Sequence, residues 1–199
     1  MGSKMVLVVC NGNIHRSVIA QICLNREVKR LGLGKKIVCV SAGLQGTFGT
    51  SPPKGRNLRD YELEWRLSAP TLRKLQVEVP ESQKATPVDE EVIVKATLIL
   101  AMDRGVLNEY PVAGRAPGLL VQFPKHGYKM RLFRELEGRI EDVPDCWGQN
   151  SRRLYEQTIR LIDRIARLRI NTLVSLVKLF SSLEEPFEDS YGTKGESVL

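Results

Sequence analysis

The sequence is poor in aromatic residues, cysteine and histidine, and each shortage argues against a class of protein. Phenylalanine, tryptophan and tyrosine make up 6% of the 199 residues, and no alternation of basic and aromatic side chains offers nucleic-acid bases a surface to stack on. Four cysteines are too few for a disulfide scaffold, and their spacing fits no zinc site. The two histidines, His15 and His126, are a poor set of metal ligands. We therefore expect no nucleic-acid partner, no metal and no other cofactor.

Long apolar runs are also lacking. No uninterrupted stretch approaches the roughly 20 residues that a membrane-spanning helix needs, and residues 170–180 are short and interrupted by Lys178. The first apolar run, residues 5–9, is too short for a secretory signal and leads directly into a loop. These features predict a cytoplasmic protein with reduced thiols and no membrane span.

The length and composition are those of a single well-packed domain. Apolar residues make up 42% of the chain and charged residues 27%, which is ordinary for a globular protein. A net charge of +7 suits an anionic substrate. Residues 181–199 place acidic side chains among glycine, serine and proline, which predicts a flexible acidic tail after a domain at residues 1–180. The oligomeric state is left open.

The most informative stretch joins a strand, a tight loop and a helix start around Cys10. Residues 5–9 predict a buried strand, and from Ser17 onward apolar residues recur at helical spacing. A loop that ends at a helix N-terminus offers an anion free N–H groups and the positive end of the helix dipole. Gly12 and Asn13 tolerate the left-handed backbone that turns such N–H groups inward.

The side chains in this loop suggest a reaction. The helix start and Arg16 both favour thiolate over thiol at Cys10. The planar Arg16 fork can hold two oxygens of a tetrahedral anion while Cys10 attacks the central atom, and Ser17 can donate a hydrogen bond to the thiolate. The alternative is an inert buried cysteine beside a solvated arginine.

This loop resembles the signature of the low-molecular-weight protein tyrosine phosphatases, which lies at their first strand-to-helix turn. The signature is a cysteine, five further residues, then arginine and serine, and Cys10, Arg16 and Ser17 match it. The resemblance implies a phosphate-binding loop after the first strand. His15 stands where most members carry a second cysteine that can form a protective disulfide with the nucleophile. The resemblance implies that the loop binds substrate through Asn11, Gly12, Asn13, Ile14, His15 and Ser17.

A second resemblance lies in the sequence Glu-Asp-Val-Pro-Asp-Cys-Trp-Gly, which ends at Gly148. The family's late acid loop carries an aspartate, usually followed by proline and an aromatic residue, that protonates the leaving oxygen. By position Asp145 takes the role of this acid and Trp147 that of the aromatic residue, while Cys146 replaces the proline. Asp142 is the competing carboxylate, and a solvated acidic turn is the alternative without a catalytic role.

Further strands and helices alternate along the chain. Residues 37–40, 97–101 and 129–133 are apolar runs that predict strands. Helix start signals occur at Ser68 with Pro70, at Thr86 with Pro87 and at Ser151. This alternation predicts an α/β fold, with a parallel sheet flanked by helices and its site at the carboxyl edge of the strands.

Other positions are assigned by the resemblance. Ser41 follows the second strand as in the family's Ser-Ala-Gly, and would brace the phosphate loop together with Asn13. Phe48 lies in a glycine- and proline-rich loop and is a candidate wall against a phosphorylated ring, or else packs onto the core. Asp103, in the family's Met-Asp position, either braces the site or caps a helix.

These features predict a phosphatase that forms a covalent intermediate on Cys10, with a phosphorylated protein or a small aryl phosphate as substrate. Ile14, in place of a smaller polar residue, favours phosphotyrosine over phosphoarginine. An arsenate reductase of the same fold would need two further cysteines as a thiol relay, but Cys23 and Cys39 fall on a helix and a strand. A protein arginine phosphatase and a phosphate-binding module without catalysis stay as alternatives.

Overall fold

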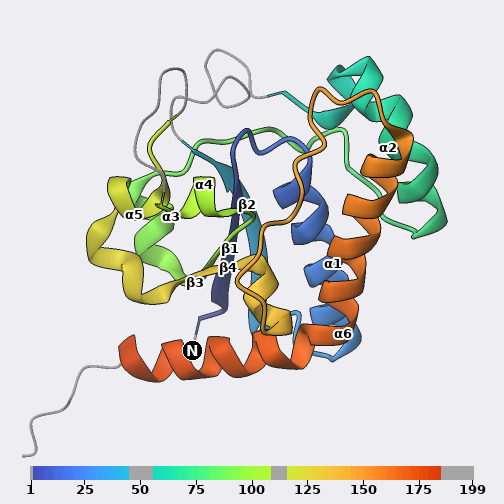
Figure 1. Cartoon of the computed structure of the whole chain (residues 1–199). Helices are drawn as coiled ribbons and strands as arrows, with labels where there is room; N and C mark the ends of the chain where they lie inside the picture. The colour runs from blue at the N-terminus through green and yellow to red at the C-terminus, as the bar shows by residue number, and fades with distance from the viewer. Residues whose placement is uncertain (1, 45–55, 109–115, 185–199) are drawn as a thin grey trace, which may run out of the picture.

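The computed structural model describes residues 2–44, 56–108 and 116–184. Within them, four parallel strands form one sheet in the order β2-β1-β3-β4 (Figure 1). The strands are β1 (Lys4–Cys10), β2 (Ile37–Gly43), β3 (Ala96–Ala101) and β4 (Met130–Leu132). All four predicted strands and the predicted α/β fold are therefore confirmed, with β4 shorter than expected.

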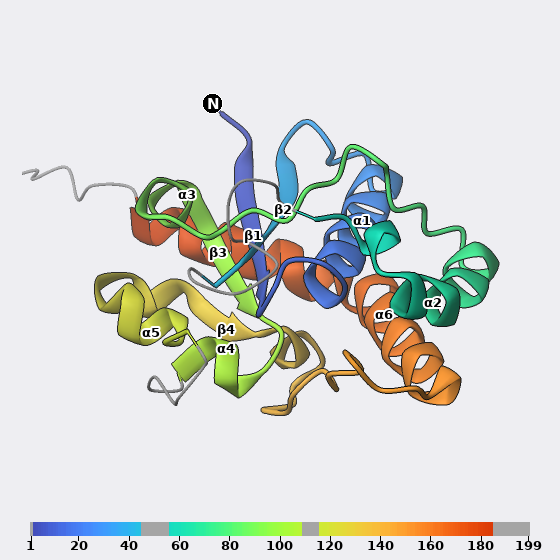
Figure 2. The same cartoon turned by 90° about the horizontal axis from the view of Figure 1, so that it is seen from above.

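Helices cover both faces of the sheet (Figures 1 and 2). One face carries α1 (Arg16–Arg30), α2 (Glu62–Lys74) and α6 (Arg152–Glu184). The other carries α3 (Glu90–Lys95), α4 (Arg104–Asn108) and α5 (Leu119–Gln122). Short 3₁₀ helices are η2 (Leu58–Asp60), η3 (Pro124–Lys129) and η4 (Phe133–Glu137).

The central strand β1 is apolar after Lys4, as suits a strand that is buried on both faces. Val6 and Val8 point into the core cluster shared with α1 and α6, whereas Leu7 and Val9 point into the cluster shared with α3 and α5. Successive side chains of β1 therefore alternate between the two cores. The strand ends at Cys10, at the carboxyl edge of the sheet.

Helix α6 has two halves with different neighbours. Its first half packs along α1 and α2, and Arg169 departs from helical geometry at a kink. Figure 1 shows the second half crossing beneath the amino ends of the strands. There Ile170, Leu173, Val177 and Phe180 are buried in the core. The helix ends at Glu184, so it continues past residue 181, where the sequence predicts the tail to begin.

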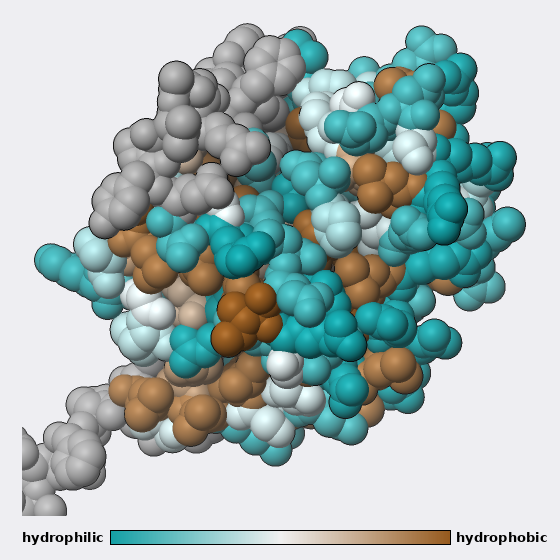
Figure 3. Space-filling view, viewed as in Figure 1, coloured by the Kyte–Doolittle hydropathy of each residue, from teal (hydrophilic) through white to brown (hydrophobic). Residues whose placement is uncertain are grey.

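The outer surface of α6 keeps some apolar side chains. Figure 3 shows brown patches along the lower edge of the molecule, where the second half of α6 lies, and Leu179 and Leu183 are exposed there. No helix in the described part of the chain is long and apolar enough to cross a membrane.

Two predicted helix starts are wrong. Helix α2 begins at Glu62, six residues before Ser68, and Pro70 lies inside it. Proline removes the hydrogen bond to the Arg66 carbonyl, but Arg66 is exposed, so water can satisfy that oxygen. Helix α3 begins at Glu90 because the Asp89 side chain caps it, accepting a 2.8 Å hydrogen bond from the Val92 N–H.

Candidate active site

The phosphate loop, residues 11–15 between β1 and α1, is held by one asparagine that contacts three separate segments. Asn13 adopts the left-handed conformation, with φ of 50°, that the sequence favours at this position. Its Nδ2 donates to Ser17 Oγ at 3.1 Å and to Ser41 Oγ at 2.8 Å. Its Oδ1 accepts from the Thr86 N–H at 2.9 Å. Ser41 thus contacts Asn13 as the resemblance leads us to expect, whereas sequence reasoning assigned Thr86 to a helix start and missed this contact.

Cys10 and Ser17 face each other across the loop. Cys10 Sγ lies 3.0 Å from Ser17 Oγ, and Cys10 is 4% exposed at the carboxyl end of β1. A serine hydroxyl at this distance can donate to a thiolate and thereby stabilise it. Because α1 begins at Arg16, the free N–H groups of its first turn lie at the end of the same loop.

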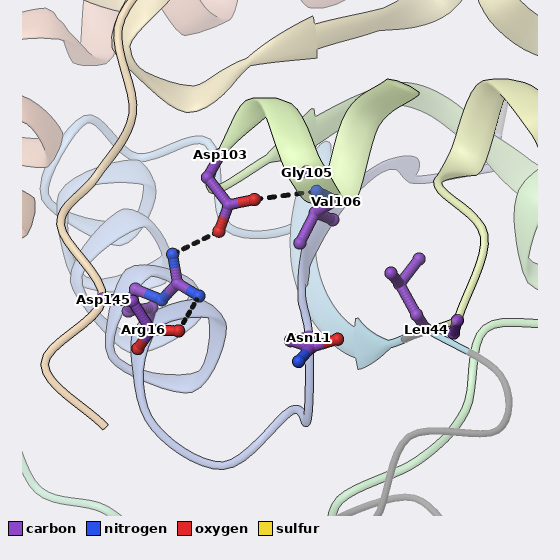
Figure 4. Close-up of a pocket in the computed structure, with 8 residues that line it drawn as sticks. Asn11, Arg16, Leu44, Asp103, Gly105, Val106 and Asp145 are labelled. Carbon is purple, nitrogen blue, oxygen red and sulfur yellow. Dashed lines mark hydrogen bonds and ion pairs between the residues drawn. The ribbon is translucent and has the colours of Figure 1, made fainter. Parts of the chain in front are cut away.

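Arg16 is buried between two carboxylates (Figure 4). Its Nη1 donates to Asp103 Oδ2 at 2.5 Å and to the Val143 carbonyl at 3.1 Å, and its Nη2 donates to Asp145 Oδ2 at 2.8 Å. Burial alone would lower the pKa of Arg16, but the charges of Asp103 and Asp145 raise it above its ordinary value. The guanidinium is therefore a fixed cation in the wall of the site.

Asp103 performs both of the roles that the sequence left open. Its Oδ2 accepts from Arg16, and its Oδ1 accepts from the Val106 N–H at 2.7 Å, in the first turn of α4. The carboxylate thus fixes the arginine to a helix that follows β3.

The two carboxylates of the acid loop have different surroundings. The Asp145 side chain is 52% exposed, and its second oxygen accepts from the Trp147 N–H at 3.1 Å. Asp142 accepts four hydrogen bonds of 2.8–3.3 Å from the backbone N–H, Nε and Nη2 of Arg104, and Nε contacts both carboxylate oxygens. The hydrogen bond from the Arg104 side chain lowers the pKa of Asp142 below its ordinary value. Asp145 therefore faces the Arg16 guanidinium, whereas Asp142 is occupied with holding α4.

A small polar cavity of about 40 Å³ lies against Arg16. Figure 4 shows how its walls converge from β1, β2, α4 and the acid loop. The residues that line it are Asn11, Arg16, Leu44, Asp103, Gly105, Val106, Ala116 and Asp145. Ile14 lies in the hydrophobic core, 5% exposed, and Phe48 falls outside the described residues.

His15 and Cys146, the two positions that depart from the family pattern, contact each other. His15 Nδ1 lies 3.6 Å from Cys146 Sγ, and His15 Nε2 lies 3.1 Å from Ser68 Oγ in α2. Burial, together with the nearby Arg16 charge, lowers the pKa of His15 to about 3, so the imidazole is neutral. Sequence reasoning missed this contact, although two departures from one pattern were the signal that could have suggested it.

The remaining cysteines are enclosed in the core. Cys23 on α1 and Cys39 on β2 are 0% and 1% exposed, and burial raises the pKa of each thiol to about 12. Neither is a thiolate at neutral pH. Among the described residues, no group of three His, Cys, Asp or Glu side chains is placed to hold a metal ion.

The fold and the site together define an α/β protein with an anion-binding loop between its first strand and first helix, and with a cysteine and an arginine in that loop. The sequence model for low molecular weight phosphotyrosine protein phosphatases matches residues 5–177. The chain belongs to this family. The family predicted from the sequence is thereby confirmed.

Individual relatives agree with this assignment. A Synechocystis protein named for the low molecular weight protein-tyrosine-phosphatases is 46% identical over 50 residues, a match that spans 25% of this chain and 32% of the relative. The crystal structure of a low molecular weight protein tyrosine phosphatase from T. tengcongensis is 24% identical, with a TM-score of 0.61, over 87% of this chain and 99% of that chain. The YwlE arginine phosphatase from Geobacillus stearothermophilus is 19% identical, with a TM-score of 0.62, over 92% and 97%. These two structures share the fold.

Proposed function

We propose that the protein is a cysteine-dependent phosphatase that hydrolyses phosphotyrosine-type monoesters through a cysteinyl-phosphate intermediate. The observation that carries the proposal is the arrangement at one strand-to-helix turn: Cys10 beside the Ser17 hydroxyl, with the Arg16 guanidinium hydrogen-bonded to Asp145. A nucleophile, an anion-binding cation and a proton donor are the three groups that this reaction needs.

In the first step, the Cys10 thiolate attacks phosphorus and the bond between phosphorus and the leaving oxygen breaks. Ser17 supports the thiolate before the attack, since its hydroxyl can donate to the sulfur. The loop N–H groups and the planar Arg16 fork hold the non-bridging oxygens as charge develops on them. Asp145 gives its proton to the leaving oxygen, so the alcohol or phenol departs neutral.

In the second step, water hydrolyses the cysteinyl phosphate. Asp145, now ionised, takes a proton from the water as its oxygen attacks phosphorus. The phosphorus–sulfur bond breaks, and inorganic phosphate leaves while Cys10 returns to the thiolate. Asp145 is again protonated, so protons and charge balance over the cycle.

The Cys10→Ser variant tests the covalent mechanism. We expect it to lose turnover of phenyl phosphate, because a serine hydroxyl in this loop is far less ionised than a thiol. It should still bind inorganic phosphate, since the loop N–H groups and Arg16 remain. Initial rates and phosphate binding by calorimetry measure the two effects, and substantial activity in Cys10→Ser would refute the proposal. A wild type that binds phosphate but hydrolyses no aryl phosphate would instead be a phosphate-binding module.

The phosphotyrosine preference is supported by the aromatic residue next to the acid. Trp147 is 38% exposed and follows Asp145 by two residues, so its ring can lie against the phenyl group of a substrate. The test compares kcat/KM on two peptides of one sequence that carry phosphotyrosine or phosphoarginine. We expect the phosphotyrosine peptide to be favoured by about 10-fold or more. The opposite order would assign the protein to the arginine phosphatases.

A further inference from the structure

The acid loop and the phosphate loop are joined by two adjacent contacts. Arg16, which follows the phosphate loop, pairs with Asp145 of the acid loop. The residue before Arg16, His15, contacts the residue after Asp145, Cys146. The two contacts differ in exposure. The Asp145 side chain is 52% exposed, whereas His15 and Cys146 are 5% and 0% exposed.

The buried contact is electrically neutral. Burial raises the pKa of the Cys146 thiol to about 12, so the thiol keeps its proton and can donate it to His15 Nδ1. With the thiol as the donor to Nδ1, the proton of the neutral imidazole lies on Nε2 and can be donated to Ser68 Oγ, 3.1 Å away. The Tyr155 ring packs edge-on against His15, at 5.3 Å between centroids. One chain of hydrogen bonds thus ties the acid loop to the phosphate loop and to α2.

The exposed contact cannot persist through the reaction as proposed. When the phosphoryl oxygens occupy the Arg16 fork, Asp145 must release Nη2 and turn towards the leaving oxygen. The ion pair that holds the acid loop in the empty site is then lost. The Cys146–His15 contact carries no charge and is buried, so a phosphoryl group bound at Arg16 does not compete for it.

We propose that the Cys146–His15 contact is a positioning device for Asp145, which keeps the acid loop over the phosphate loop while Arg16 is occupied by the substrate. Cys146 and His15 touch no substrate atom in this role and act through the backbone that carries Asp145. The inference rests on the proposed phosphatase function.

The test compares two substrates with different leaving groups. In Cys146→Ala, kcat/KM for phenyl phosphate should fall by about 10- to 100-fold, because the acid is misplaced. For 2,4-dinitrophenyl phosphate, kcat/KM should change by less than about 2-fold, because its phenol leaves without a proton. Inhibition by inorganic phosphate should stay as in the wild type, since Arg16 and the loop N–H groups are unchanged.

Three further variants make the test specific. Cys146→Ser keeps a donor for His15 Nδ1 and should recover most of the lost rate. His15→Phe keeps a ring against Tyr155 but removes both nitrogens, and should show the same leaving-group dependence. In the double variant Cys146→Ala with His15→Phe, the loss should not exceed that of either single variant, because both remove the same contact. Cys23→Ala, an equally buried cysteine in the core, is the matched control and should affect both substrates alike.

The outcomes separate the two proposals. Equal losses on both substrates in Cys146→Ala, or additive losses in the double variant, would overturn the positioning role while leaving the phosphatase function intact. A wild type without activity on phenyl phosphate would refute the function and this inference with it. If Cys146→Ala fails to fold, His15→Phe decides the question from the other side of the contact.

Discussion

At the scale of the residue, the site is organised by one buried cation. Arg16 is 4% exposed and is held by Asp103, Asp145 and the Val143 carbonyl. A buried guanidinium must be paired, because an isolated charge in the interior is costly. Asp103 is only 20% exposed and its other oxygen holds α4, whereas Asp145 is more exposed and reaches Arg16 from a loop. Asp145 is therefore the partner that can leave when a phosphoryl group arrives.

Replacing each of the two carboxylates in turn identifies the general acid. In Asp145→Asn, hydrolysis of phenyl phosphate should slow by roughly 10²–10⁴-fold, the usual contribution of a general acid. The loss should shrink for 2,4-dinitrophenyl phosphate, which needs no protonation. Asp142→Asn is the matched control and should be much milder, because Asp142 holds Arg104 and its lowered pKa keeps it ionised.

Steady-state rates of both variants on both substrates measure this difference. A strong, leaving-group-dependent loss in Asp142→Asn with a mild effect in Asp145→Asn would transfer the role to Asp142. Equal losses on both substrates in both variants would make the loop structural.

The lowered pKa of His15 makes the stability of the fold depend on pH. Its pKa is about 3 in the folded chain and about 6.5 in the unfolded chain, so the unfolded state binds the extra proton between these values. The free energy of unfolding should therefore rise with pH across this window, with a contribution from His15 of about 1 kcal/mol per pH unit between pH 5 and 6. Well above pH 7 the contribution of His15 to this slope should vanish, because His15 is neutral in both the folded and the unfolded state.

Urea unfolding of the wild type and His15→Phe at several pH values measures this contribution. The carboxylates and His126 are common to both proteins, so the difference in slope isolates His15. Identical pH dependence in the two proteins would show that His15 is not held neutral by the fold.

At the scale of the element, the sequence predicts what is local. The strands were predictable because a central parallel strand such as β1 is apolar on both faces, and the Cys10 loop because strand, glycine and helix signals are contiguous. The start of α2 was not predictable in this way. Ser68 and Pro70 are a local start signal, but Leu67 is buried beside Cys146 and Tyr155, and this packing of α2 on α6 extends the helix towards its amino end.

Contacts between distant segments were harder to predict. His15 and Cys146 are 131 residues apart, and periodicity or propensity within a short window says nothing about such a pair. Asp103 is intermediate between a local signal and a contact of distant segments. Both of its roles could be stated from the sequence, but only the packing of α4 beside the phosphate loop shows that a single carboxylate can fill them together.

In the whole molecule, the site and the second half of α6 lie at opposite edges of the sheet. Cys10 and the acid loop are at the carboxyl ends of the strands, while the second half of α6 crosses beneath the amino ends (Figure 1). The two regions are connected through the core cluster that contains Val6, Val8 and Cys10 from β1 together with Leu173 and Val177 from α6. The second half of α6 should therefore support stability without contributing a group to the reaction.

Truncation of the chain tests this division. Removing residues 170–199 deletes Ile170, Leu173, Val177 and Phe180, which are at most 3% exposed in the fold, and leaves the core that they cover open to water. Burial of four such side chains stabilises by roughly 6–12 kcal/mol as an upper figure, comparable to the roughly 5–15 kcal/mol that holds a typical domain folded. We therefore expect the chain ending at Arg169 to be unfolded, or to melt far below the full chain in circular dichroism.

The matched control removes residues 185–199 and keeps all of α6. Its melting temperature and its kcat/KM should stay close to those of the full chain, because every buried side chain that the structure describes in the helix remains. A chain ending at Arg169 that melts within a few degrees of the full protein would show that the second half of α6 does not stabilise the core. If the shorter chain is partly folded at low temperature, its rate per folded molecule should match the full chain, since none of the described residues 170–184 lines the site.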